Sequence, residues 1–319
     1  MGAESDIRPG DILLFHGHSF VSWAIRLFDG TDVNHAAIAL TADEMGEATG
    51  SGLEANSIGP AIKSNDRTYI RRLRGSPEAT PVVAKAREFL ASNIPYAYQE
   101  IVLLAVLSLT RRVPVNNPLV RRVLRPLLDH AAEFVNSLVD RGRDLMICSE
   151  FVYRCYVESR DPNFHLEIGL AARAAGLGGE ETLLEWAKHR PELEPMVAGP
   201  RPRPTGDPDE IAAEANAELE PLIADFAREQ SPEEAASLAP AGFAATVVGP
   251  TEVSDDELQR AAVRLRDAFN DLKGRLPLEA IPEMASPWDV FEDTVADFVT
   301  PGDLLARCSS LETIAELEP

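Results

Sequence analysis

A chain of 319 residues, of which 45% are hydrophobic and 26% charged, is long enough for one large globular domain or two smaller ones. Its formal net charge of −22 argues against nucleic acid as the main partner, because contacts with phosphates need a basic surface. We interpret the acidity as a charge that favours solubility.

The beginning of the chain has the pattern of short strands around one helix. Apolar runs and residue-by-residue alternation predict the strands, and turn residues separate them. We expect strands at 11–15, 34–40 and 53–55, a helix at 20–28, and a glycine-containing connection at 45–52.

Helical patterns dominate the rest of the chain. Apolar spacing predicts helices at 81–91, 98–109, 119–139, 209–227 and 255–276, and one at 148–157 that begins at or just before Cys148. The Pro-rich stretch 191–208 between them indicates a linker or an extended loop. Much of the acidity lies in the two helical segments after this stretch.

We expect the chain to be organised in four parts. These are a first compact domain at 1–177, a Pro-rich linker at 178–208, an acidic helical insertion at 209–297 and a C-terminal segment at 298–319. The last part is expected to return to the first domain, because the turn-plus-strand motif at 9–13 (PGDIL) reappears at 301–305 (PGDLL). Two such strand entries could place both ends of the chain on one sheet.

The three cysteines, Cys148, Cys155 and Cys308, are too few for a disulfide framework and fit a reducing compartment. We expect no metal and no cofactor, since the sequence has no Cys/His cluster at zinc spacing. It shows no secretory signal, and its longest apolar stretch, 101–109, is too short to span a bilayer. We therefore expect a cytoplasmic protein.

Cys148 stands where the apolar lead-in 145–147 meets an amphipathic helix. Amides at a helix N-terminus stabilise a thiolate, and the same N–H groups can receive the oxyanion of an acyl-transfer intermediate. The alternative is a buried small apolar residue, the commonest role of a free cysteine. Cys155, inside the helix, fits that alternative, and Cys308 has no supporting context.

His35 is a candidate base for Cys148. It lies on a predicted strand whose same-face neighbours, Ala37 and Ala39, are small enough for a Cys-bearing helix to come close. The alternative is a histidine at the edge of a strand. His16 follows the first strand and could line the same cleft, in a structural or substrate-contacting role.

Glu54 is the third candidate residue of the site. If its strand forms a hairpin with that of His35, its carboxylate can bind the far nitrogen of His35 and fix the tautomer. An ordinary solvent-facing glutamate is an equally good interpretation.

Several segments together resemble the permuted, YiiX-like branch of the NlpC-type, papain-like superfamily. They are PGDILLF, the segment 19–26, NHAAIAL, LEANSIGP, CSEFVYRCY and the closing FVTPGDLLA. The match covers roughly 7–160 and 298–306, and the order of histidine, acidic or polar residue and cysteine is the reverse of papain's. The resemblance implies an α+β fold in which an antiparallel sheet packs on helices, with 1–177 as the catalytic domain.

The same resemblance implies roles for individual residues. Cys148 would be the nucleophile, His35 the general base and Glu54 the orienting residue. Independently of the resemblance, we include His16 and Ser19 among the substrate-binding candidates. Tyr96 looks like the tyrosine of the family's Gly-x-x-Tyr segment, although residues 93–95 replace the glycine here. We include it among the substrate-binding candidates.

The first functional hypothesis is thiol-dependent hydrolysis of an amide or ester, on a peptide, small-molecule or lipid-like acyl substrate. An alternative is acyl transfer between lipids, for which the apolar and Arg-rich region 101–125 would suit contact with an anionic membrane surface. The interpretation that we prefer for this region is an ordinary amphipathic helical layer over the sheet. The sequence Cys-Ser-Glu at 148–150 favours the hydrolase branch. A second alternative is a non-catalytic interaction module whose acidic helices bind a protein partner.

Overall fold

The computed structural model describes residues 6–75, 78–92, 96–97, 99–169, 181–191, 208–238, 252–273, 286–296 and 298–319. Contacts divide the chain into two compact units. Unit 1 comprises Met1–Gln99, Asp144–Arg173 and Val299–Pro319, and unit 2 comprises Glu100–Arg143 and Ala174–Phe298.

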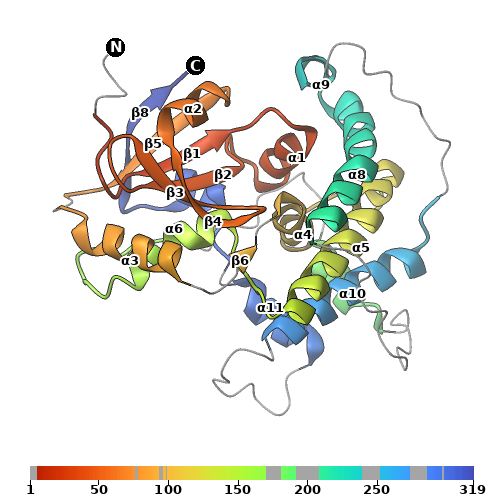
Figure 1. Cartoon of the computed structure of the whole chain (residues 1–319). Coiled ribbons are helices and arrows are strands. Elements are labelled where there is room, and N and C mark those ends of the chain that lie inside the picture. Colours follow the sequence, from red (N-terminus) through yellow and green to blue (C-terminus); the bar gives the residue numbers. More distant parts are fainter. Residues whose placement is uncertain are drawn as a thin grey trace. The chain divides into compact units, whose positions relative to one another are not determined.

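A six-stranded antiparallel sheet is the framework of unit 1 (Figure 1). Its strand order is β4-β3-β2-β1-β5-β8. The strands are β1 (Ile12–His16), β2 (His35–Ala39), β3 (Glu44–Thr49), β4 (Gly52–Ser57), β5 (Arg67–Leu73) and β8 (Leu311–Leu317). The first four residues of β1 are buried, as expected for a central strand with an apolar run.

Strand β3 occupies most of the segment that the sequence predicted as a connection. Gly46 suggested a loop, because glycine weakens strand interiors. In the sheet, however, this glycine lets two side chains come close: a Cβ at Gly46 would lie 3.2 Å from Leu90 Cδ1 and 3.4 Å from Phe151 Cζ. The prediction of a connection at 45–52 was therefore wrong, since the glycine serves packing rather than a turn.

Different structural elements pack on the two faces of the sheet. Helices α3 (Thr80–Ala91) and α6 (Cys148–Val157) lie on the face of Gly46 (Figure 1). The opposite face holds an apolar cluster to which α2 (Ile58–Lys63) contributes. The cluster consists of Ile7, Leu13, Phe15, Ala37, Ala39, Met45, Ile58, Ile62, Ile70 and Leu317.

The C-terminal segment lies in unit 1, but it does not begin as a strand. Residues 301–305, predicted as a strand entry, are helical and include part of a π-helical turn, η4 (Asp303–Arg307). This turn lets Arg307 bind Asp29 Oδ1 at 2.8 Å and Asp303 Oδ1 at 3.2 Å. β8 follows the turn and pairs with β5, so both β1 and β8 belong to one sheet.

Unit 2 is built from helices. They are α4 (Glu100–Thr110), α5 (Pro118–Arg141), α7 (Leu183–Lys188), α8 (Pro208–Gln230), α9 (Pro232–Leu238), α10 (Asp255–Lys273) and α11 (Pro287–Ala296). Helix α5 packs against both α8 and α10. Every residue of α4 from Ile101 to Leu109 is buried, so this helix is a core element of unit 2.

The boundaries of the units differ from the division expected from the sequence. Residues 100–143 were assigned to the first domain, whereas α4 and α5 belong to unit 2 because α5 packs on α8 and α10. The region predicted as a linker, 178–208, contains α7, and its residues 192–207 lie outside the described part of the chain. Mixed α and β structure with an antiparallel sheet is confirmed; the circular permutation remains a prediction.

Candidate active site

Cys148 and His35 each occupy the first position of their element. Cys148 begins α6 directly after Ile147, whose extended backbone ends the preceding segment, and its side chain is fully buried. His35 begins β2, pairs in register with Phe15 of β1, and has a side chain that is 18% exposed. Helix α6 packs against β2, which brings the two residues together.

A chain of short contacts runs from His35 outward across the sheet. His35 Nε2 lies 2.6 Å from Glu47 Oε2, and the Asn56 Nδ2 group donates a hydrogen bond of 2.9 Å to Glu47 Oε1. The Glu47 carboxylate, 12% exposed, thus has one oxygen for the histidine and one for the amide.

Opposing effects act on the pKa of His35. Burial alone would lower it, but the charge and hydrogen bond of Cys148, followed by those of Glu47, outweigh burial and hold the pKa well above its usual value. Glu47 shows the converse: burial would raise its pKa, yet the contacts with His35 and Asn56 lower it. The surroundings therefore favour an imidazolium next to a carboxylate, the charge state of an activated cysteine site.

The acidic residue in contact with His35 is Glu47, so the predicted contact between Glu54 and His35 is wrong. In the sheet order, β3 stands between β2 and β4, so the acidic residue next to His35 comes from β3. Glu47 and Glu54 are directly opposite each other, but Glu54 is exposed and accepts a 3.2 Å hydrogen bond from Thr49 Oγ1. The prediction failed because β3 had been taken for a connection.

The role expected for the small residues on the face of His35 also differs. Ala37 and Ala39 were expected to make room for the Cys-bearing helix. Instead they pack in the apolar cluster with α2, whereas α6 approaches the face of Gly46. The close approach of α6 to the sheet is thus made possible by Gly46 and not by the alanines.

His16 and Ser19 have partners within unit 1. His16 Nδ1 lies 2.8 Å from Asp32 Oδ1, and burial, together with the charge of Arg26, lowers the pKa of His16 despite Asp32 and Asp66. Ser19 is the N-cap of α1 (Phe20–Asp29), where its Oγ accepts a 2.9 Å hydrogen bond from Ser22 N–H. Substrate contact by either residue remains a prediction.

The backbone of Tyr96 lies close to the start of the cysteine helix. Strand β6 (Tyr96–Ala97) pairs in parallel with β7 (Asp144–Leu145), which ends shortly before Cys148. The side chain of Tyr96 lies outside the described part of the structure, so its contact with a substrate remains a prediction. Among the residues that the structure describes, no group of three or more His, Cys, Asp or Glu side chains could hold a metal ion.

Sequence reasoning missed Glu47 and Asn56. The usable signal was spacing, because Glu47 follows His35 by 12 residues, a separation suited to two short strands joined by a tight turn. Gly46, adjacent to Glu47, obscured that signal.

Comparison with known proteins identifies a class of hydrolases to which the chain is similar. No family model matches the sequence. The sequence is 30% identical over 161 residues to the protein named probable lipoprotein peptidase YaeF, from Escherichia coli K12. The matched residues make up 49% of this chain and 58% of that relative. The resemblance to YiiX-like, papain-like hydrolases is thereby confirmed.

The similarity to a solved structure is weak. The crystal structure of the metalloprotein YiiX from Escherichia coli O157:H7 aligns with a TM-score of 0.32 and 15% sequence identity, and covers 50% of this chain and 71% of that one. None of the helices within the described residues is long and apolar enough to cross a membrane. The cytoplasmic location remains a prediction.

Proposed function

We propose that the chain is a thiol-dependent hydrolase, an amidase or peptidase, with Cys148 as nucleophile, His35 as general base and Glu47 as orienting residue. The observation that carries the proposal is the position of His35, whose imidazole interacts with Cys148 and with Glu47. A nucleophile, a base and a group that orients the base are the minimum that covalent acyl transfer requires.

The chemistry divides into two steps. In the first, His35 accepts the thiol proton, Sγ of Cys148 attacks the substrate carbonyl, and the leaving amine or alcohol departs with the proton from His35. In the second, His35 removes a proton from water, which attacks the thioester and releases the carboxylic acid and the free thiol. The backbone N–H groups at the start of α6 are suited to receive the oxyanion of both steps.

Amide substrates fit the proposal best. The relative is named a probable lipoprotein peptidase, and the chain covers 58% of that protein, so a peptide or lipoprotein substrate is carried over here as part of the proposal. The order His35, Glu47, Cys148 along the chain is what a circularly permuted papain-like fold would give. We include that permutation in the proposal.

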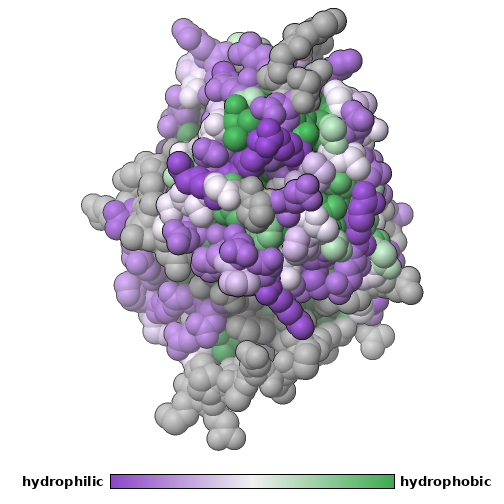
Figure 2. Space-filling view, turned by 90° about the vertical axis from the view of Figure 1, so that its left-hand side faces the viewer, coloured by the Kyte–Doolittle hydropathy of each residue, from purple (hydrophilic) through white to green (hydrophobic). Residues whose placement is uncertain are grey.

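Acyl transfer between lipids receives less support. The apolar residues 101–109 that suggested contact with a lipid surface are buried in unit 2. Val157, 45% exposed, is the one large apolar side chain exposed within the described residues. The face of unit 1 in Figure 2 is mostly hydrophilic, with apolar residues in small separate areas.

Alkylation by iodoacetamide tests the proposal, because this reagent is small enough for a buried thiol. We expect selective modification of Cys148, located by mass spectrometry, and a reaction about 10²-fold slower in His35→Asn, which lacks the base. Cys155 is a matched control: it lies on the same helix, is equally buried, and its pKa is raised by that burial. Equal modification of both cysteines, or a rate unchanged in His35→Asn, would rule out the proposed site.

A further inference from the structure

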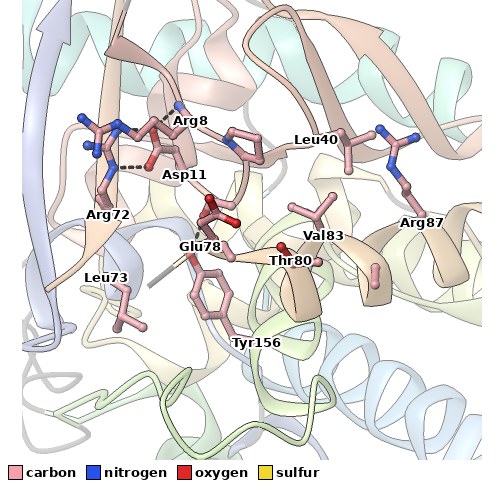
Figure 3. A pocket seen from close by; sticks show the side chains of 14 residues that line it. Arg8, Asp11, Leu40, Arg72, Leu73, Glu78, Thr80, Val83, Arg87 and Tyr156 are labelled. Carbon is pink, nitrogen blue, oxygen red and sulfur yellow. Dashed lines mark hydrogen bonds and ion pairs between the residues drawn. The ribbon is translucent and has the colours of Figure 1, made fainter. Parts of the chain in front are cut away.

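A pocket lies in unit 1, away from the cysteine site. It has a volume of about 740 Å³, within the range of small-molecule sites. Its walls come from the residues just before β1 and just after β2, from the end of β5, from the beginning of α3 and from the end of α6. Figure 3 shows the side chains that line it.

The pocket and the cysteine site lie at opposite ends of the same elements. Leu40, in the pocket, follows β2, and His35 begins that strand, which separates them by about 16 Å at 3.3 Å per residue. Tyr156, also in the pocket, is eight residues beyond Cys148 on α6, or about 12 Å along the helix. A ligand in this pocket is therefore not at the reacting thiol.

One end of the pocket carries charges that neutralise each other. Arg72 binds the buried Asp11 through two contacts, Nε to Oδ1 at 2.6 Å and Nη2 to Oδ2 at 2.7 Å, and the Arg8 N–H donates to the same carboxylate. The Arg8 side chain and Glu78 lie near this pair (Figure 3). Arg8 also binds Asp6 Oδ1 at 3.3 Å, so two arginines face three carboxylates at this end, which carries no surplus positive charge.

The other end is cationic. Arg87 stands there beside Leu40 and Val83 (Figure 3). Its ion-pair partner, Glu44, is 3.6 Å away, and both side chains are about half exposed, at 53% and 43%, so this pair contributes little. Arg87 is consequently a lining cation with a weak, exposed partner, in a chain where acidic residues outnumber basic ones by 52 to 30.

We propose that this pocket binds a small organic carboxylate with an apolar body. The carboxylate would pair with the Arg87 guanidinium, whose planar donors suit two oxygens, and the apolar body would lie on Leu40 and Val83. The Arg72–Asp11 pair forms the fixed polar wall at the far end. The site is independent of the chemistry proposed for Cys148.

Titration of the full-length protein with hexanoate, followed by calorimetry, tests this proposal. We expect saturable binding that weakens about 10-fold in Arg87→Gln, the loss expected for one charge-assisted hydrogen-bonding group. Lys63→Gln is the matched control, because it removes one exposed positive charge from unit 1 outside the pocket. Val83→Trp, which fills the pocket, should abolish binding if it folds with an unchanged circular dichroism spectrum.

Two further ligands distinguish the contribution of the charge to binding affinity from that of the apolar contact. Hexanol has the same apolar body without the charge, and inorganic phosphate has charge without the body; both should bind at least about 10-fold more weakly than hexanoate. No saturable binding of hexanoate, equal binding of hexanol or phosphate, or an affinity unchanged in Arg87→Gln would each overturn the proposal. Alkylation of Cys148 should be the same in Arg87→Gln and the unaltered protein, which keeps the two sites distinguishable.

Discussion

Glu47 and Glu54 are directly opposite each other on neighbouring strands, yet the contact with His35 is made by Glu47. Glu54 lies one strand farther from His35 than Glu47 does. Neighbouring strands are about 4.8 Å apart, and a carboxylate cannot bridge that extra distance. The second oxygen of Glu47 accepts from Asn56, which fixes the carboxylate rotamer. In the proposed site, Asn56 would therefore be a positioning residue that acts through Glu47.

Replacing Glu47 by Gln should lower the pKa of His35. The carboxylate stabilises the imidazolium, so its removal makes His35 release its proton at lower pH than in the unaltered protein. A titration of the His35 imidazole by NMR measures the change without a substrate. Glu54→Gln is the matched control and should leave the titration of His35 where it is. A shift in Glu54→Gln, or none in Glu47→Gln, would contradict the assignment of the orienting residue.

The elements that carry Cys148 and His35 could be predicted from the sequence, whereas the one that carries Glu47 was missed. Helix 148–157 and the strands near 12–16 and 35–39 follow from apolar periodicity, which burial imposes directly. β3 contains Gly46, and the absence of a side chain at this position makes room for Leu90 of α3 and Phe151 of α6. A contact between elements distant in the sequence leaves no periodic signal.

Gly46→Val should lower the free energy of unfolding by about 1–3 kcal/mol. The added methyl groups would enter space already filled by Leu90 and Phe151, and overpacking of this kind has that typical cost. Gly59→Val is the matched control, since a Cβ at Gly59 meets nothing within 4 Å and its effect should be within about 0.5 kcal/mol. Urea unfolding of both variants measures the difference; equal stabilities would refute the packing role of Gly46.

At the scale of the whole molecule, unit 1 is assembled from three separate stretches of sequence. The short echo of 9–13 in 301–305 predicted that both ends of the chain share a sheet, although residues 301–305 are helical. The division into units could not be read from composition, because the packing of α5 on α8 and α10 joins helices far apart in the sequence.

Arg307 links the C-terminal segment of unit 1 (Val299–Pro319) to α1 through ion pairs. It binds Asp29 and Asp303, and both carboxylates are fully buried. Arg307→Met should therefore lower the free energy of unfolding by about 3–5 kcal/mol, because two buried charges lose their shared partner. Arg74→Met, at an exposed arginine of the same unit, is the control and should change stability by less than about 1 kcal/mol. Comparable losses in both variants would contradict this role.

The pairing of β5 with β8 has a consequence for synthesis on the ribosome. Arg71 and Thr313, which are bonded across these strands, are 242 residues apart. At 5–20 residues per second, β5 waits about 12 to 48 s for its neighbour. An open strand edge invites pairing with other nascent chains, and charged side chains discourage it. β5, with the sequence RTYIRRL, carries three arginines, whose charges should discourage such pairing until β8 has been translated.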